Sequence, residues 1–350
     1  MVDELVSARL FQAAIPAELG GLGVDPLTLL ELVEEISRQD GSTGWCLGMG
    51  ALIGGIAAAM LPEAGAREVF ADPRRTICAG GYPPQGRARR EGDGFRVRGQ
   101  FSFGSGCRHA DWMVCTCVVE DAAAAAGGEA EVRSFCVPTP RVRLHDNWQV
   151  SGLEGTASCD YSLEDEYVPE RFSYLPMQWG SARGQAFYGL PLLSVAAVPH
   201  IGFALGVARR ALEEIAAQAR GRTRLSSAAA LSERPAFQRD FARAQTRLRA
   251  ARALAFDALS ALWEAHLAGG RVELSQRAHL TAALTHAYET SLETTDFAFR
   301  GAGARALFRG HRLQRCQRDI QAGGQHILAS EESWERVGQA LLGVGEPRMV

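Results

Sequence analysis

Two polar side chains in glycine-rich surroundings are the strongest candidates for chemistry in this sequence. Ser105 lies between Gly104 and Gly106, and glycines allow backbone N–H groups to approach a ligand closely. Its hydroxyl can donate or accept one hydrogen bond at short range. His326 follows a pair of glycines, and an imidazole that titrates near neutral pH suits proton transfer or the binding of a polar group on a substrate. The alternatives are an ordinary Ser-Gly hairpin and a structural histidine.

Two further stretches carry hydrogen-bond donors. The segment from Trp148 to Ser158 contains small residues and the hydroxyls of Thr156 and Ser158, although an ordinary β-turn has the same composition. Farther along, Arg222 and Arg224 belong to a cluster of arginines, whose planar guanidinium groups suit phosphate. Most such clusters are solvated surfaces, so this second signal is weak alone.

Composition restricts the class of protein. A chain of 350 residues, 47% hydrophobic and 22% charged, is typical of a globular protein with two or three packed units. A net charge of −3 disfavours a nucleic-acid-binding surface. No signal peptide is recognisable, and the eight cysteines are widely spread, so we expect reduced, buried thiols in a cytoplasmic protein without a metal site.

The pattern of apolar residues predicts an α+β fold with three domains. Helices are expected around Pro26–Ile36 and over Gly44–Leu61, where 18 residues without a charge are better explained by a buried helix ended by Pro62 than by a membrane span. Alternating residues predict strands at Phe95–Phe103, Trp112–Val119, Val132–Val137 and Tyr161–Val168, with a loop over Glu120–Glu131. Apolar stripes predict a four-helix bundle over Ile201–Ala219, Phe241–Trp263, Leu280–Phe297 and Leu313–Leu342. The predicted domains are helical (1–75), β-barrel-like (76–185) and a helical bundle (186–350).

Four motifs, in this order, resemble the acyl-CoA dehydrogenase superfamily. They are Pro-x-x-x-Gly-Gly-x-Gly followed by a helix and Asp-x-Ser-x-x-Trp near the N-terminus, the Phe101–Trp112 stretch, the Trp148–Ser158 stretch, and Arg318-Asp319 after a glycine turn. Dehydrogenases of the superfamily commonly place a glutamate in a Tyr-Glu-Gly-Thr context, which is absent here. His326 stands in the corresponding stretch, so the chain resembles the two-component, flavin-dependent monooxygenases, to which the Ser-Gly-Cys-x-His-Ala-x-Trp pattern around Ser105 also points.

This resemblance implies roles for the candidate residues. Ser105 is expected near the reactive edge of the flavin and His326 beside the substrate, as the two catalytic residues. The other cofactor-binding residues implied are Phe103, Trp148, Thr156, Ser158 and either Arg222 or Arg224, the arginine contacting flavin phosphates. Arg318 and Asp319 are expected to brace the loop that carries His326, and His109 to be a structural turn residue.

The resemblance also implies the reaction and the partners. Reduced FMN or FAD would react with O2 to a C4a-hydroperoxyflavin, which hydroxylates an electron-rich substrate. The chain shows no nucleotide-binding βαβ unit, so an NAD(P)H-dependent flavin reductase is the expected partner. The superfamily is usually tetrameric, so we expect a homotetramer that associates through the helical bundle.

Two departures from the family pattern bear on the substrate and the N-terminal edge. Phenol-hydroxylating relatives usually carry a histidine where this chain has Met49 to Ile53. A pocket lined by Met49, Leu52 and Ile53 would suit a bulky aromatic or polycyclic substrate such as a natural product. Relatives also carry a further helix before the first motif.

Two alternatives from other classes stay open at this stage. One is an acyl-CoA dehydrogenase-like dehydrogenase or oxidase, with Glu331 or another carboxylate as base. The other is a flavin-free assembly protein with the same fold.

Overall fold

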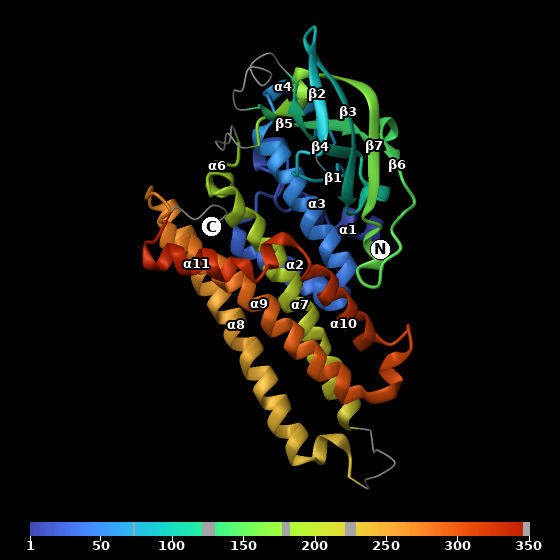
Figure 1. Ribbon diagram of the computed structural model, residues 1–350, viewed down its shortest axis with the longest axis vertical. Coiled ribbons are helices and arrows are strands. Elements are labelled where there is room, and N and C mark those ends of the chain that lie inside the picture. Colours follow the sequence, from blue (N-terminus) through green and yellow to red (C-terminus); the bar gives the residue numbers. More distant parts are fainter. Residues whose placement is uncertain (73, 121–129, 177–182, 221–228, 346–350) are drawn as a thin grey trace. The chain divides into compact units, whose positions relative to one another are not determined.

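The computed structural model describes residues 1–72, 74–120, 130–176, 183–220 and 229–345 (Figure 1). The chain separates into two compact units. The first contains Met1–Asp25, Cys46–Gln149 and Thr156–Val195, and the second contains Pro26–Trp45, Val150–Gly155 and Ala196–Val350. The division into three domains at 75 and 185 stays a prediction.

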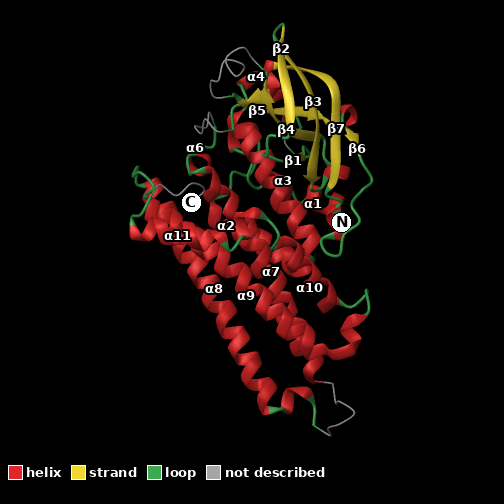
Figure 2. Cartoon of the chain, in the orientation of Figure 1, coloured by secondary structure: helices red, strands yellow, loops and turns green. Residues whose placement is uncertain are grey.

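The first unit is built on an eight-stranded sheet (Figure 2). Its strands are β1 Cys78–Gly80, β2 Gly86–Glu91, β3 Gly94–Gly104, β4 Trp112–Val119, β5 Val132–Pro138, β6 Arg143–Leu144, β7 Cys159–Pro169 and β8 Ser173–Tyr174. The order is β6-β7-β3-β2-β4-β5-β8, with β1 paired to β4. The four strands predicted from alternation are β3, β4, β5 and β7, whereas the other four were not predicted. Of the expected loop over Glu120–Glu131, residues 121–129 lie outside the described part of the chain.

One pairing in this sheet matters for the site. β3 and β7 run antiparallel, with Gly104 opposite Cys159 and a register irregularity between Phe101 and Gly104. Such an irregularity re-aims the residues that follow it. The end of β3 and the start of β7 are therefore neighbours, and the residues just beyond them, including Ser105 and Ser158, are brought together.

The helices of the first unit are α1 Val2–Ser7, α4 Glu63–Val69, α6 Gln185–Tyr188 and most of α3 Gly41–Met60. Glycines let other segments approach α3 closely: a Cβ at Gly55 would lie 1.7 Å from the Tyr188 hydroxyl. That hydroxyl donates to the Ala14 carbonyl at 2.6 Å. A side chain at Gly55 would displace Tyr188, so this glycine permits the close packing of α6 on α3.

Two helices, α3 and α7 (Leu192–Arg220), are apolar and long enough to cross a membrane. In α3, 89% of the apolar window is buried, and in α7 78%. The core helix of a protein without a membrane span meets the same criterion.

The second unit is helical and contains α2 Pro26–Gln39, α8 Pro235–Leu267, α9 Leu274–Ala302, α10 Arg312–Gly323, α11 Glu332–Leu342 and nearly all of α7. α9 packs against α8, α10 and α11 (Figure 1). α2 meets α7 at two glycines: a Cβ at Gly202 would lie 2.7 Å from the Leu30 carbonyl oxygen, and one at Gly206 2.2 Å from that of Glu34. This close approach fixes the place of Glu34 against α7.

The structure corrects two details of the predicted bundle. The segment Leu313–Leu342 is not one helix, because α10 ends at Gly323 and α11 begins at Glu332. His326 lies in the connection between them. The first helix is longer than the predicted Ile201–Ala219 stripe, because it begins at Leu192 and contains Pro199 in its interior, where proline removes one backbone hydrogen-bond donor.

Candidate active site

In the first unit, the last residues of β3 present an exposed aromatic ring, and a buried serine follows directly. Phe103 has φ +64° and is 68% exposed. The left-handed conformation costs a non-glycine residue about 1–2 kcal/mol. A Cβ at Gly104 would lie 3.1 Å from the Cys159 carbonyl oxygen, so the turn packs tightly on β7. Ser105 then points inward and is buried. Strain of this kind is commonly retained at binding sites.

Three buried hydroxyls form a chain behind this turn. The Ser105 Oγ lies 2.7 Å from the Ser158 Oγ, which lies 2.6 Å from the Thr156 Oγ1. The Gly106 N–H donates to the Thr156 carbonyl at 2.9 Å and ties the two segments together. Since each hydroxyl both donates and accepts, the direction of the Ser105 O–H depends on Ser158. The structure thus brings together the three hydroxyl residues singled out from the sequence.

Trp148 adds a second aromatic ring to this part of the first unit. Its ring lies edge-on to that of Phe103, with centroids 6.3 Å apart and an interplanar angle of 88°. Ala157, in the same sequence motif as Trp148, has φ +43°. Of the four non-glycine residues with positive φ in the described ranges, Phe103, Leu153 and Ala157 all fall in the two motifs that resemble flavin-binding segments.

The remaining candidates of the first unit form no hydrogen bond with the three hydroxyls in the described structure. Burial lowers the pKa of His109, whose Nε2 would be 3.0 Å from a Cβ at Gly106. This contact fits a structural turn residue. Leu52 and Ile53 are buried on α3 and Met49 is half-buried. Their place in a substrate pocket stays a prediction.

In the second unit, His326 caps a short helical turn with its own ring. The Leu328 N–H donates to the His326 Nδ1 at 3.3 Å. Because Nδ1 accepts, the neutral ring carries its hydrogen on Nε2. Burial lowers the pKa of His326 to about 4. At neutral pH the residue is therefore an uncharged N–H donor rather than an imidazolium acid.

His200 is a neighbour of His326 that the sequence analysis did not identify. It lies on α7, is 2% exposed, and its ring centroid is 4.2 Å from that of His326. The His200 Nδ1 is 3.4 Å from the Tyr288 hydroxyl on α9. Trp45 lies edge-on to both histidines, at 5.2 Å from His200 and 6.1 Å from His326. The only available signal was a histidine within an apolar stripe, which more often marks a core residue.

Arg318 and Asp319 bind a different segment from the one expected. The Asp319 Oδ1 accepts the Leu153 N–H at 2.7 Å. Arg318 donates to the Ser151 carbonyl at 2.7 Å and pairs with Glu154. Burial raises the pKa of Asp319 to about 6. These residues hold the Val150–Gly155 segment, which leads directly into Thr156, and do not contact His326 through any hydrogen bond in the described structure.

Three other candidates gain no support. Arg222 and Arg224 lie outside the described residues, so their role stays a prediction. Glu331 is exposed at the start of α11.

The eight cysteines are free and buried, as predicted. Among the described residues, no group of three His, Cys, Asp or Glu could hold a metal ion.

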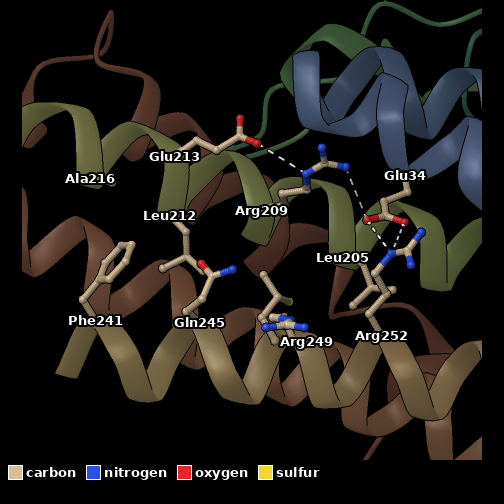
Figure 3. Close-up of a pocket in the computed structure, with 11 residues that line it drawn as sticks. Glu34, Leu205, Arg209, Leu212, Glu213, Ala216, Phe241, Gln245, Arg249 and Arg252 are labelled. Carbon is tan, nitrogen blue, oxygen red and sulfur yellow. Dashed lines mark hydrogen bonds and ion pairs between the residues drawn. The ribbon is translucent and has the colours of Figure 1, made fainter. Parts of the chain in front are cut away.

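A groove of about 500 Å³ lies between α7 and α8 in the second unit (Figure 3). Leucines and Phe241 line it, and its charges are largely neutralised within it. The Glu34 carboxylate accepts from the Arg252 Nε at 2.8 and 3.1 Å and lies 3.8 Å from Arg209. None of the candidate catalytic residues lines this groove. We interpret its charged residues as stabilising the packing of α2, α7 and α8.

The contacts of Glu34 with Arg252 and Arg209 lead to a prediction about the free energy of unfolding. Glu34→Gln should lower the free energy of unfolding by about 1–3 kcal/mol, because it leaves two arginines without a buried anion. Glu31→Gln is the matched control: its carboxylate is 60% exposed, 3.4 Å from Arg252, and should change stability by less than about 1 kcal/mol. Urea unfolding of the two variants measures both values. Equal effects would contradict a structural role for the buried carboxylate.

Comparisons with known proteins were consistent along the chain. Residues 1–69 match the family model for the N-terminal domain of acyl-CoA dehydrogenase, and residues 199–331 match that for the C-terminal domain. The indole-3-acetate monooxygenase of Pseudomonas putida is 31% identical over 351 residues, covering 98% of this chain and 86% of the relative. The oxygenase component of the FADH2-dependent resorcinol hydroxylase of a Rhizobium species is 28% identical, covering 97% and 86%.

Solved structures agree with these relatives. The crystal structure of the HsaA monooxygenase from Mycobacterium tuberculosis has a TM-score of 0.89 and 26% sequence identity to this chain. The similarity covers 100% of this chain and 91% of that one. The fold similarity thus extends over the whole chain.

Proposed function

The chain belongs to the acyl-CoA dehydrogenase superfamily, in its branch of flavin-dependent monooxygenases, and from that premise we propose that it hydroxylates an aromatic substrate as the oxygenase component of a two-component system. The observation that carries the proposal is the combination of a buried hydroxyl chain at Ser105 with a neutral histidine at position 326, where a dehydrogenase has a carboxylate base. Relatives named as monooxygenases along nearly the whole chain support it.

The chemistry of the residues present fits a reduced flavin. A flavin has a flat, largely apolar ring system with a polar edge, and needs both an apolar surface and hydrogen-bond groups. Phe103 and Trp148 supply exposed and half-exposed aromatic surface, and Ser105, Thr156 and Ser158 supply hydroxyls. Gly104 allows close approach of the backbone. We propose reduced FAD, by similarity to the relative named as FADH2-dependent, with FMN as the alternative.

When bound, a reduced flavin would supply the two electrons that activate dioxygen, so that one oxygen atom of O2 enters the substrate and the other leaves as water. In our proposal Ser105 donates a hydrogen bond to the polar edge of the ring, and Ser158 and Thr156 orient that donor. A donor held in place before the reaction stabilises developing charge without reorganisation. The burial of the three hydroxyls excludes water from behind the turn.

His326 acts in this proposal as a hydrogen-bond donor to the substrate. Its Nδ1 is engaged by the Leu328 N–H, so its Nε2–H is the group that can bind an oxygen atom of the substrate. A pKa of about 4 keeps the ring neutral above pH 6, and its binding role should therefore not change between pH 6 and 9.

For the substrate, we propose an aromatic compound with fused rings and a polar substituent. The first unit carries no histidine on α3 between Met49 and Ile53, and Leu52 and Ile53 give this stretch aliphatic character. Of the relatives, one is named for resorcinol, which has a single aromatic ring, and one for indole-3-acetate, which has two fused rings. We also propose a separate NAD(P)H-dependent flavin reductase as the partner and a cytoplasmic location.

A homotetramer is the proposed assembly. Large apolar side chains are exposed on the helices of the second unit, including Leu254, Leu267, Trp334, Leu341 and Leu342. Apolar surface of this kind commonly marks a contact with another chain. Sedimentation of the purified protein measures the state directly.

The test of function supplies photoreduced FAD to the protein without oxygen and then admits oxygen with indole-3-acetate or a bicyclic phenol. We expect an absorbance transient before flavin reoxidation and one hydroxylated product per flavin oxidised. Reoxidation at the rate of free flavin with every aromatic acid and phenol tested would contradict the proposal. Reduction of bound flavin by an acyl thioester would support the dehydrogenase alternative instead, and failure to bind flavin the assembly protein.

A further inference from the structure

The second unit contains a buried histidine whose surroundings point to a role in the site. His200 lies on α7, far in sequence from His326 on the α10–α11 connection, yet their rings are nearly in contact, with centroids 4.2 Å apart and an interplanar angle of 34°. A buried histidine has lost the hydration of two ring nitrogens, which requires compensation by protein groups. Tyr288 supplies one such group at 3.4 Å.

Tyr288 and His200 form a hydrogen bond between two uncharged groups. Burial raises the pKa of Tyr288, so the phenol keeps its hydrogen. Burial and the neighbouring His326 lower the pKa of His200, so this ring is uncharged. The Tyr288 hydroxyl and the His200 Nδ1 share one hydrogen bond, in which either group can be the donor, depending on the tautomer of His200. This bond restrains the plane of the His200 ring.

The plane of His200 in turn limits the plane of His326. One face of the His326 ring is near His200, and Trp45 lies edge-on to it at 6.1 Å. α10 also packs closely against this cluster, because a Cβ at Gly323 would lie 2.3 Å from a ring carbon of Phe203. The Phe203 ring in turn lies edge-on to that of Trp45. Rotation of the His326 ring would require movement of these neighbours, which are buried.

We propose that His200 is a positioning residue, held by Tyr288, that fixes the ring of His326 so that its Nε2–H points in one direction. The inference rests on the proposed function for its catalytic consequence, but its structural content is independent of flavin. Two neutral rings can stack closely, whereas two imidazolium ions at this distance would repel each other. The pair is therefore suited to a donor that stays neutral.

The positioning test observes the His326 ring itself. In protein labelled with ¹³C and ¹⁵N in histidine, the ring resonances report which nitrogen carries the hydrogen, and His326→Gln identifies the signal. We expect a single Nε2–H tautomer in the wild type. In His200→Leu we expect the signal to move toward the average of both tautomers, and in Tyr288→Phe to move in the same direction by less.

The controls separate positioning from folding. His279→Leu removes an exposed histidine from α9 and should leave the His326 signal unchanged. Tyr288→Phe removes one oxygen atom from the core, so it remains informative if His200→Leu does not fold. An unchanged tautomer signal of His326 in both His200→Leu and Tyr288→Phe would overturn the proposal.

The catalytic consequence is measured separately. With His200→Phe, which keeps a flat ring but accepts no hydrogen bond, we expect the yield of hydroxylated product per flavin oxidised to fall about fivefold, with flavin binding unchanged. Wild-type protein that binds flavin but hydroxylates nothing would end the proposed function and leave the positioning result standing. A full yield in His200→Phe with normal hydroxylation by the wild type would end the positioning role.

Discussion

Replacing Ser105 by alanine is expected to lower the yield of hydroxylated product per flavin oxidised by about 10²-fold. The Ser105 Oγ is one end of a buried hydroxyl chain that reaches Thr156 through Ser158. Loss of one preorganised donor at a reacting group typically costs on the order of 10²- to 10³-fold in rate. Oxygen consumption should continue, with hydrogen peroxide released in place of product. Parallel assays of product and peroxide measure the partition.

Two variants control this prediction. Ser158→Ala removes the residue that orients Ser105 and should lower the yield by a smaller factor, about 10-fold, because the donor is still present. Ser102→Ala removes a hydroxyl of β3 that does not belong to the chain of three hydroxyls, and it should leave the yield unchanged. A wild-type yield in Ser105→Ala would contradict the proposed role of Ser105. A fall in Ser102→Ala of equal size would mean that the turn, and not the hydroxyl, matters.

Periodicity predicted the fold where one face of an element is buried and failed where it is not. Phe95–Phe103 alternates and became β3, whereas β2 (Gly86–Glu91) is dominated by arginine and buries little besides Gly86 and Ala88. Its place in the sheet comes from backbone pairing with β3 and β4, which no side-chain pattern encodes. The break between α10 and α11 lies at a pair of glycines that the predicted stripe passed over.

The candidate site was likewise predictable from the sequence only in part. Ser105 and the Thr156–Ser158 segment could be singled out because each belongs to a local motif, but the bond between Ser105 and Ser158 depends on the register of β3 and β7. His200 has no motif, and its importance arises only from contacts with residues distant in sequence. Asp319 was expected to brace the His326 loop, and its bond to Leu153 was not foreseeable from spacing.

Asp319 supports a second large prediction, on the dependence of stability on pH. Burial raises its folded-state pKa to about 6 from the ordinary value of 3.8, against the lowering effect of the Leu153 N–H. Between these values the native state binds a proton that the unfolded state releases. The free energy of unfolding contributed by this group is therefore fully present below about pH 4 and falls by about 3 kcal/mol as pH rises through 6.

Asp319→Asn should remove this loss while keeping an oxygen to accept the Leu153 N–H. We expect wild type and variant to have similar stability at pH 4, and the variant to be more stable by up to about 3 kcal/mol at pH 8. Urea unfolding at both pH values measures the difference, with Asp257→Asn, an exposed aspartate on α8, as the matched control.

A variant less stable than wild type at pH 8 would show that Arg315 and Arg318 stabilise the ionised carboxylate more than burial destabilises it. A gain in stability combined with a lower product yield would instead mean that the charge of Asp319 acts on the Val150–Gly155 segment, since this segment leads into the hydroxyl chain at Thr156.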